Sequence, residues 1–219
     1  MAGMVSSPDA RPGTRRVRKH PDERRAEILA AAADIALDEG LERITLRAVA
    51  ERIGVRPGLI THYYPSAEDL VIAAFVRAAE GERATAYPTQ GAPLARVATL
   101  VHDMEAPASD PLSKLWLNAR HLSRFTPALA QAVHEQEELN VASLRAIIED
   151  GMADGTFRCD DALAACVRLL VAIDGHGAYV NDVGGFTHEA YRRFVTDTAE
   201  WALGLERGAL AAGGAGESG

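Results

Sequence analysis

The side chains from Arg56 to Tyr63 are of the types that proteins use to bind nucleic acid. Arg56 can donate hydrogen bonds to a guanine edge or a phosphate, and Thr61 offers a hydroxyl to phosphate or base and a methyl group to thymine. His62 and Tyr63 suit the phosphate backbone, because phosphate oxygens accept hydrogen bonds from imidazole and phenol groups. The chemistry predicted for this segment is therefore the noncovalent recognition of double-stranded DNA.

Two short helices joined by a tight turn are needed to hold these side chains. The apolar residues of the first helix recur at helical spacing, at Leu46, Val49, Ala50 and Ile53. Thr45 is a suitable N-cap, Gly54 stands where that helix must end, and Pro57 fits the first turn of the second helix. This pattern predicts a helix-turn-helix, whose second helix enters the major groove.

The first turn of the second helix completes the predicted contact surface. Gly58 allows a close approach of the backbone to DNA, and Leu59 can pack on a thymine methyl group. Ile60 and Tyr64 are expected to face the core instead. The predicted DNA-binding residues are Thr45, Arg56, Pro57, Gly58, Leu59, Thr61, His62 and Tyr63.

The segment from about Glu27 to Phe75 resembles the DNA-binding domain of the TetR family of bacterial repressors. The resemblance rests on Ile28-Leu29-Ala30-Ala31-Ala32, Gly40, Thr45, Ala50, Gly54-Val55, Gly58 and the run from Ile60 to Leu70. Within the family, the residues from Gly58 to Tyr63 are most similar to the choline-responsive, betaine-pathway type. One position departs from the family pattern: the residue after Ser66 is commonly Lys, and here it is Ala67. One phosphate contact is therefore lost or supplied elsewhere.

Two further helices are expected to frame the helix-turn-helix. The first runs from about Asp22 to Glu39, with an inner stripe of Ile28, Ala32, Ile35 and Ala36. The other starts at Ser66, where an acid at Asp69 resembles a capping box, and runs to roughly Arg83. Residues 21–84 are thus predicted to form a DNA-binding domain with a linking helix.

Residues 1–20 are rich in Ser, Pro, Gly and Arg and predict a disordered basic arm. Two interpretations of its cations are open. They lie along phosphates or in a minor groove of DNA, or they belong to a solvated tail; the cations are Arg15, Arg16, Arg18 and Lys19. The net charge of the chain is −8, but residues 1–25 hold seven basic and three acidic residues. Positive charge is concentrated where DNA would bind, so the acidic remainder does not argue against DNA as the partner.

The composition predicts an all-α fold. Of 219 residues, 47% are hydrophobic and only 5% aromatic, and Ala and Leu abound, which favours helix over sheet. No apolar run approaches the roughly 20 residues that span a membrane, and the N-terminus lacks the apolar core of a signal peptide. Cys159 and Cys166 then predict free thiols in a reducing cytoplasm, with a redox pair as the alternative.

A second domain is expected to follow the breakers from Tyr87 to Pro93. Helices are predicted at about 94–105, 110–124, 127–153, 161–181 and 187–207. Residues 85–207 would form this domain, and the Gly/Ala-rich residues 208–219 a disordered tail.

The second domain contains a candidate site for a small molecule, which the family resemblance implies is an inducer. Trp116, His121 and Phe125 lie on one predicted helix, and Met104, His176 and Tyr179 are further candidates for the wall. The alternative is an ordinary core with a buried, satisfied histidine. If the betaine-type resemblance extends to the ligand, Trp116 can stack on a quaternary ammonium. An apolar or aromatic metabolite is the alternative ligand.

The last two predicted helices carry apolar stripes that need a partner. The candidate interface residues are Leu163, Val167, Leu170, Phe194, Trp201 and Leu205. The family resemblance implies that these helices pair across a two-fold axis into a four-helix dimer interface. The alternative is that the stripes belong to the core of one chain.

Nothing in the sequence predicts an enzyme or a cofactor. His134 and Glu138 have the i, i+4 spacing of metal ligands, but no third ligand accompanies them, so no metal site is predicted. No nucleophile elbow or phosphate-binding glycine loop occurs. The predicted function is a homodimeric, ligand-responsive repressor that binds a palindromic operator. The alternatives are an activator of the same fold, a helical-bundle enzyme and a protein-binding adaptor.

Overall fold

The computed structural model describes residues 20–182 and 185–213. The α-helices are α1 (Pro21–Asp38), α2 (Leu46–Arg52), α3 (Pro57–Tyr63), α4 (Ala67–Ala86), α5 (Pro93–Glu105), α6 (Asp110–Ser123), α7 (Pro127–Ala153), α8 (Ala162–Gly177), α9 (Glu189–Arg192), α10 (Phe194–Ala202) and α11 (Ala209–Gly213). Within the described ranges there are also two 3-10 helices, η1 (Leu41–Arg43) and η2 (Pro107–Ser109). The described ranges contain no strand, and the prediction of an all-α fold is confirmed.

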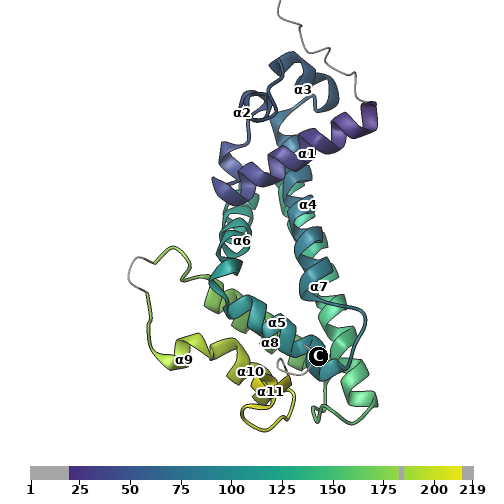
Figure 1. Cartoon of the computed structure of the whole chain (residues 1–219), viewed down its shortest axis with the longest axis vertical. Helices are drawn as coiled ribbons and strands as arrows, with labels where there is room; N and C mark the ends of the chain where they lie inside the picture. The colour runs from purple at the N-terminus through teal and green to yellow at the C-terminus, as the bar shows by residue number, and fades with distance from the viewer. Residues whose placement is uncertain (1–19, 183–184, 214–219) are drawn as a thin grey trace, which may run out of the picture.

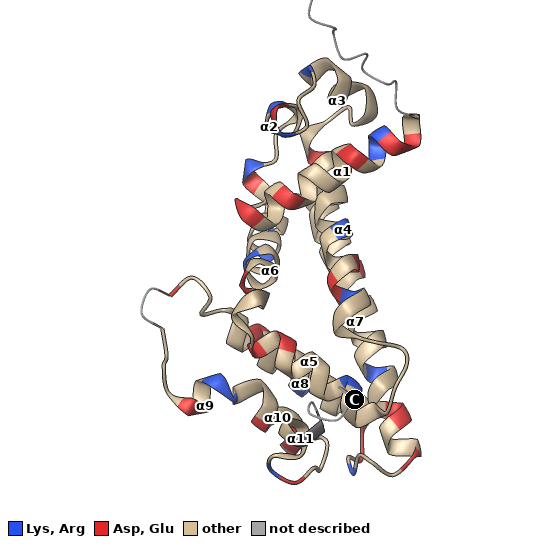
Figure 2. Cartoon of the chain, in the orientation of Figure 1, with Lys and Arg blue, Asp and Glu red and all other residues tan. Residues whose placement is uncertain are grey.

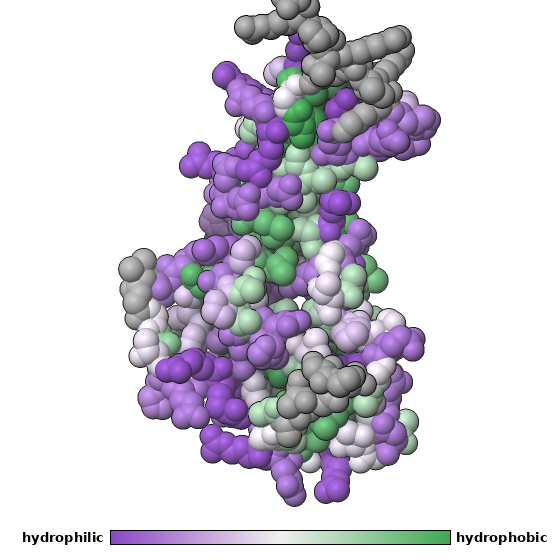
Figure 3. All heavy atoms as spheres, viewed as in Figure 1, coloured by the Kyte–Doolittle hydropathy of each residue, from purple (hydrophilic) through white to green (hydrophobic). Residues whose placement is uncertain are grey.

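Helices α1 to α3 form a head at one end of the molecule (Figure 1). Helices α4 and α7 pack side by side and run from the head along one edge, and α6 descends along the other. Helices α5 and α8 cross the far end, where α10 packs against both. The face in Figure 3 is largely hydrophilic, with apolar residues in patches along its middle. Because α4 packs against both α1 and α7, it connects the head directly to the body.

Local signals in the sequence determine where many of these helices begin. Proline occupies the first position of α1, α3, α5 and α7, at Pro21, Pro57, Pro93 and Pro127. The side chains of Thr45, Ser66 and Asp161 cap α2, α4 and α8 by accepting hydrogen bonds from backbone N–H groups. These residues are the reason why most starts agree closely with the sequence prediction.

Two apolar cores hold the chain together, and their border does not follow the predicted domain boundary. The first combines the head with the adjoining parts of α6 and α7, so that Phe75 packs edge-on against Trp116 with ring centroids 5.2 Å apart. The backbone N–H of Leu41 also donates to Asn118 Oδ1 at 2.7 Å. The second core joins α5, α8 and α10 to the remaining part of α7. The head is thus packed onto the body by side chains as well as by the covalent link.

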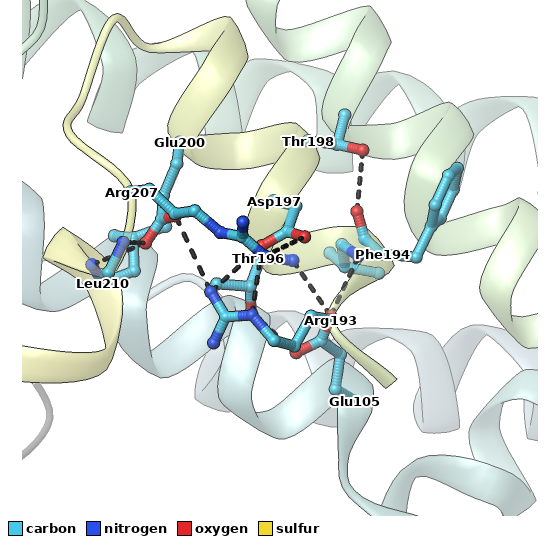
Figure 4. Close-up of polar contacts among 11 residues, drawn as sticks. Glu105, Arg193, Phe194, Thr196, Asp197, Thr198, Glu200, Arg207 and Leu210 are labelled. Atoms are coloured by element: carbon cyan, nitrogen blue, oxygen red, sulfur yellow. Dashed lines mark hydrogen bonds and ion pairs between the residues drawn. The ribbon is translucent and has the colours of Figure 1, made fainter. Parts of the chain in front are cut away.

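Two glutamates hold α10 in place (Figure 4). Glu105 Oε1 accepts hydrogen bonds from the backbone N–H groups of Val195 and Thr196, both at 2.9 Å, and its Oε2 accepts from Thr196 Oγ1 at 2.6 Å. Glu200 Oε1 accepts from the backbone N–H of Leu210 at 3.1 Å. These contacts tie α10 to α5 on one side and to α11 on the other.

The C-terminal third differs from the sequence prediction. The helix predicted at 187–207 is divided into α9 and α10, because Glu105 caps a new helix start at Phe194 from a distant part of the chain. The helix predicted at 161–181 ends at Gly177. The tail predicted as disordered from residue 208 contains α11, in which Leu210 is buried because it packs in the second core. Apolar periodicity along the sequence contains no signal for a cap that comes from another helix.

We expect Glu105→Ala to destabilise the body more than any loss of a surface charge. The substitution leaves two backbone N–H groups and a hydroxyl without their acceptor, at a cost of roughly 3 kcal/mol in the free energy of unfolding. Thr196→Val removes only the hydroxyl contact and should cost about 1 kcal/mol. Urea unfolding followed by circular dichroism measures both. An equal, small effect of the two variants would contradict a capping role for Glu105.

Candidate functional site

The predicted recognition helix is α3, which lies at the outer end of the head (Figure 1). The Thr45 hydroxyl accepts a hydrogen bond from the N–H of Ala48 at 3.0 Å and so fixes the start of α2. Gly54 has φ of +65° in the turn between α2 and α3, a conformation that favours glycine. The turn and the two helices form the helix-turn-helix that the sequence predicts.

The exposure along α3 separates an outer from an inner set of residues. The exposed residues are Thr45, Arg56, Pro57, Gly58, Thr61 and His62, and Leu59 and Tyr63 are half-buried. Ile60 and Tyr64 are buried in the first core, as predicted. Every predicted DNA-binding residue is thus accessible, at least in part, in the single chain.

Charged residues of both signs surround the helix-turn-helix (Figure 2). Arg47 pairs with Glu51, and Arg52 pairs with Asp38 and Glu39. Within the described residues, Arg56 forms no ion pair, so its guanidinium is available to a ligand. This arrangement suits the hydrogen bonding to bases and phosphates that the residue types predict.

A cavity of about 310 Å³ lies in the body, bounded mainly by α6, α7 and α8, and α4 contributes Glu82 to its wall. Its size is at the lower end of the range for small-molecule sites. Much of the wall is apolar, with contributions from Met104, Leu112, Trp116, Val141, Leu170 and Ile173. Its ionisable residues include Glu82, Arg120, Glu137 and Asp174. An apolar wall with a few polar groups is the usual composition of a binding site for a small organic molecule.

The polar groups of the cavity wall are connected in two separate sets. Glu82 Oε2 accepts a hydrogen bond from Trp116 Nε1 at 2.6 Å, and burial raises the pKa of Glu82 above its ordinary value. Arg120 donates to Glu137 at 3.0 Å and pairs with Asp174 at 2.9 Å. Its guanidinium carbon also lies 5.4 Å from the centre of the Trp116 ring. One face of Trp116 therefore already has a cation from the chain itself.

Residues 28–74 match the family model described as bacterial regulatory proteins, tetR family. The head is a TetR-type DNA-binding domain. No curated protein matches the chain. Among solved structures, a putative transcriptional regulator from Saccharomonospora viridis in complex with choline is 22% identical, with a TM-score of 0.69, covering 82% of this chain and 96% of that one.

Two further solved structures show the same likeness over most of the chain. A TetR transcription regulator from Haloarcula marismortui is 20% identical, with a TM-score of 0.70, covering 84% of this chain and 97% of that one. The transcriptional regulator FadR from Bacillus subtilis, in complex with stearoyl-CoA, is 17% identical, with a TM-score of 0.62, covering 81% and 97%. The chain thus shares the fold of these solved structures over most of its length.

The predicted effector residues fall into three places. Trp116 and Met104 line the cavity. His121 and Phe125 do not: His121 lines a hollow between α1 and α6, and Phe125 is 70% exposed. His176 and Tyr179 lie outside the cavity in an aromatic cluster, where His176 stacks on Tyr191 at 4.4 Å. Trp116 and His121 point in different directions from α6, because positions five apart differ by about 140° around a helix.

Glu82 is one of several cavity residues that the sequence analysis does not predict. It continues a stripe of α4 that is buried at Phe75, Ala78, Ala79 and Ala86. A carboxylate at a core position of an amphipathic helix is unusual and requires an explanation. That position on the stripe is the signal that identifies Glu82 from sequence.

Helices α8 and α10 present apolar side chains to solvent. The exposed residues are Leu163, Val167, Val171, Phe194 and Trp201. Trp201 is 68% exposed, and the Arg168 guanidinium carbon lies 5.0 Å from its ring centre. Leu170 and Leu205 are half-buried and pack against the second core. Four of the six predicted interface residues are therefore accessible, and two belong in part to the core of one chain.

The two cysteines have the properties of structural thiols. Cys166 is buried and Cys159 half-buried, and both are free. Burial raises the pKa of Cys166 to about 11 and also raises that of Cys159, whereas a reactive thiol needs a lowered pKa.

Among the described residues, no helix is long and apolar enough to span a membrane.

Proposed function

We propose that this chain is a ligand-responsive transcriptional repressor that acts as a cytoplasmic homodimer on palindromic operator DNA. The observation that carries the proposal is the path of α4. This helix begins four residues after the end of the recognition helix, and its last turns contribute Glu82 to the cavity wall. One rigid element thus connects the proposed DNA-binding and effector sites.

Dimerisation through α8 and α10 would carry two recognition helices to one face of DNA. The exposed apolar residues on these helices support this interface, since large exposed apolar residues in a cluster mark sites of association. In a symmetric dimer the two α3 helices must be spaced by about one turn of DNA, roughly 35 Å, to enter successive major grooves.

The proposed switch follows from thermodynamic linkage. An effector that binds more tightly to a conformer with another spacing of the heads lowers DNA affinity, but only by its differential affinity for the two conformers. Activation of transcription by the same chain is the second candidate, because DNA recognition does not fix the outcome at the promoter. A reporter gene with the operator placed within or upstream of the promoter distinguishes the two functions.

The finer resemblance to choline-responsive regulators concerns the residues from Gly58 to Tyr63, which we propose to contact DNA. This segment lies in the head and does not line the cavity. The solved regulator with bound choline supports the fold at 22% identity. Support for a choline-type effector must therefore come from the residues that line the cavity.

The proposal is tested by footprinting purified protein on genomic DNA, which identifies the operator and the adjacent genes together. We expect a palindromic footprint, with the two half-sites about one helical turn apart. Protection of a single half-site by monomer, or the absence of any specific site, would refute the proposal.

We expect operator affinity to fall steeply with salt concentration. Each phosphate contact contributes about 0.9 to the slope of log K against log salt, and two heads with several contacts each give a slope well above that of one contact. Titration of fluorescent operator DNA at several salt concentrations measures the slope. A slope near zero would contradict phosphate recognition by the head.

A further inference from the structure

We infer that the effector of this cavity is an organic cation, and that Glu82 supplies its counter-charge. The inference rests on the proposed function of the cavity as the effector site. It adds the chemical class of the ligand and the residue that selects it.

The charges of the cavity wall do not balance. Three carboxylates, from Glu82, Glu137 and Asp174, face a single guanidinium from Arg120. Arg120 is engaged by Glu137 and Asp174 together. Of the groups that line the cavity, Glu82 is therefore the carboxylate left without a cation.

The groups around Glu82 support this assignment. Its only hydrogen-bond donor among the described side chains is the neutral indole of Trp116. The neighbouring Arg83 donates to the neutral amide oxygens of Gln136 and Asn140, at 2.8 and 3.1 Å, and forms no ion pair with Glu82 in the described ranges. A carboxylate withdrawn from water without a cation costs free energy, and a bound cation would offset that cost.

Other ligand classes fit the wall less well. An anion would face an excess of carboxylates, and the guanidinium of Arg120 is already paired. A neutral ligand would shield Glu82 further from water without pairing its charge. A bare metal ion would need a cluster of ligands, and the described residues contain no group of three suited to one. The apolar wall instead suits the alkyl or aryl groups of an organic ammonium ion.

The surroundings of Glu82 raise its pKa above the ordinary glutamate value. Burial raises it, Asp174 adds to the rise, and Trp116, Arg83 and Arg120 oppose it. A group whose folded-state pKa is raised costs stability as the pH rises from the ordinary glutamate range through the raised value. Glu82→Gln removes that cost and keeps an oxygen that can accept from Trp116. We therefore expect this variant to fold and to be at least as stable as wild type above neutral pH.

The test is isothermal titration calorimetry of the full chain with a series of ammonium ions, from tetramethylammonium through choline to benzyltriethylammonium. Each ion is compared with its neutral isostere, in which a quaternary carbon replaces the nitrogen, where that isostere dissolves. At least one cation should bind saturably, and at least about tenfold more tightly than its isostere, because the isostere cannot pair with the carboxylate. Absence of binding by the whole series, or equal binding of a cation and its isostere, would overturn the inference.

Two variants assign the effect to Glu82. Glu82→Gln should lose the preference for the cation, whereas Glu80→Gln, the same change on the exposed face of α4, should keep it. Cation binding that survives in Glu82→Gln would show that another group supplies the charge. Operator binding is measured separately. A cation that binds through Glu82 but leaves operator affinity unchanged would refute release by the effector and leave the ligand class intact.

Discussion

Trp201→Lys is expected to dissociate the dimer and, with it, to abolish tight binding to operator DNA. Trp201 is a large, exposed apolar residue on α10, and such residues anchor protein interfaces. Arg168 lies over its ring, so a lysine here adds a second positive charge in each subunit. Loss of an aromatic anchor contributes about 2–4 kcal/mol, which raises the dimer dissociation constant by about 30-fold to 700-fold.

Analytical ultracentrifugation over a range of protein concentrations measures this dissociation constant. Leu139→Lys is the matched control, because Leu139 is also exposed and apolar but lies on α7. The control should remain dimeric and bind the operator. A folded Trp201→Lys variant with wild-type dimerisation would move the interface away from α10.

Arg56→Ala is expected to weaken operator binding by about 1–3 kcal/mol per subunit and to change the sequence preference. Arg56 is exposed at the N-cap of α3, where a side chain reaches base edges in the major groove. Tyr63→Ala should weaken binding to all sequences alike, because phosphates carry no sequence information. Binding assays on a library of operator variants separate the two effects.

Arg145→Ala is the control for the loss of one exposed arginine. Arg145 lies on α7, where it pairs with Glu149, far along the chain from the head. Its removal should leave the operator preference unchanged. Wild-type affinity and preference in Arg56→Ala would refute the assignment of α3 as the recognition helix.

The head could be predicted from sequence because its determinants are local. Thr45 and Ser66 cap helices from within the same turn, Gly54 adopts a positive φ, and Pro57 starts α3. The match of residues 28–74 to the tetR family model confirms the helix-turn-helix. The individual DNA-binding residues remain predictions, supported by their exposure.

The cavity and the C-terminal helices depend on contacts between distant residues. Trp116 was predicted as a wall residue and lines the cavity, but the phase of α6 carries His121 away from it. Glu82 enters the wall from α4, and no local pattern connects it with Trp116. The division of α9 from α10 likewise depends on Glu105, which lies about ninety positions earlier. Sequence periodicity identifies the helices but not which of their faces meet.

The packing of Phe75 against Trp116 determines which parts of this protein can be exchanged with another regulator. The first core takes Leu115, Trp116 and Leu129 from the body into contact with the head. A chimera joined after α4 would therefore carry the head away from its own packing partners. An exchange that keeps those partners must include the adjoining halves of α6 and α7, although they lie outside the segment that is recognisable by sequence. In this protein the segment that is recognisable by sequence is shorter than the set of residues that pack into one core with it.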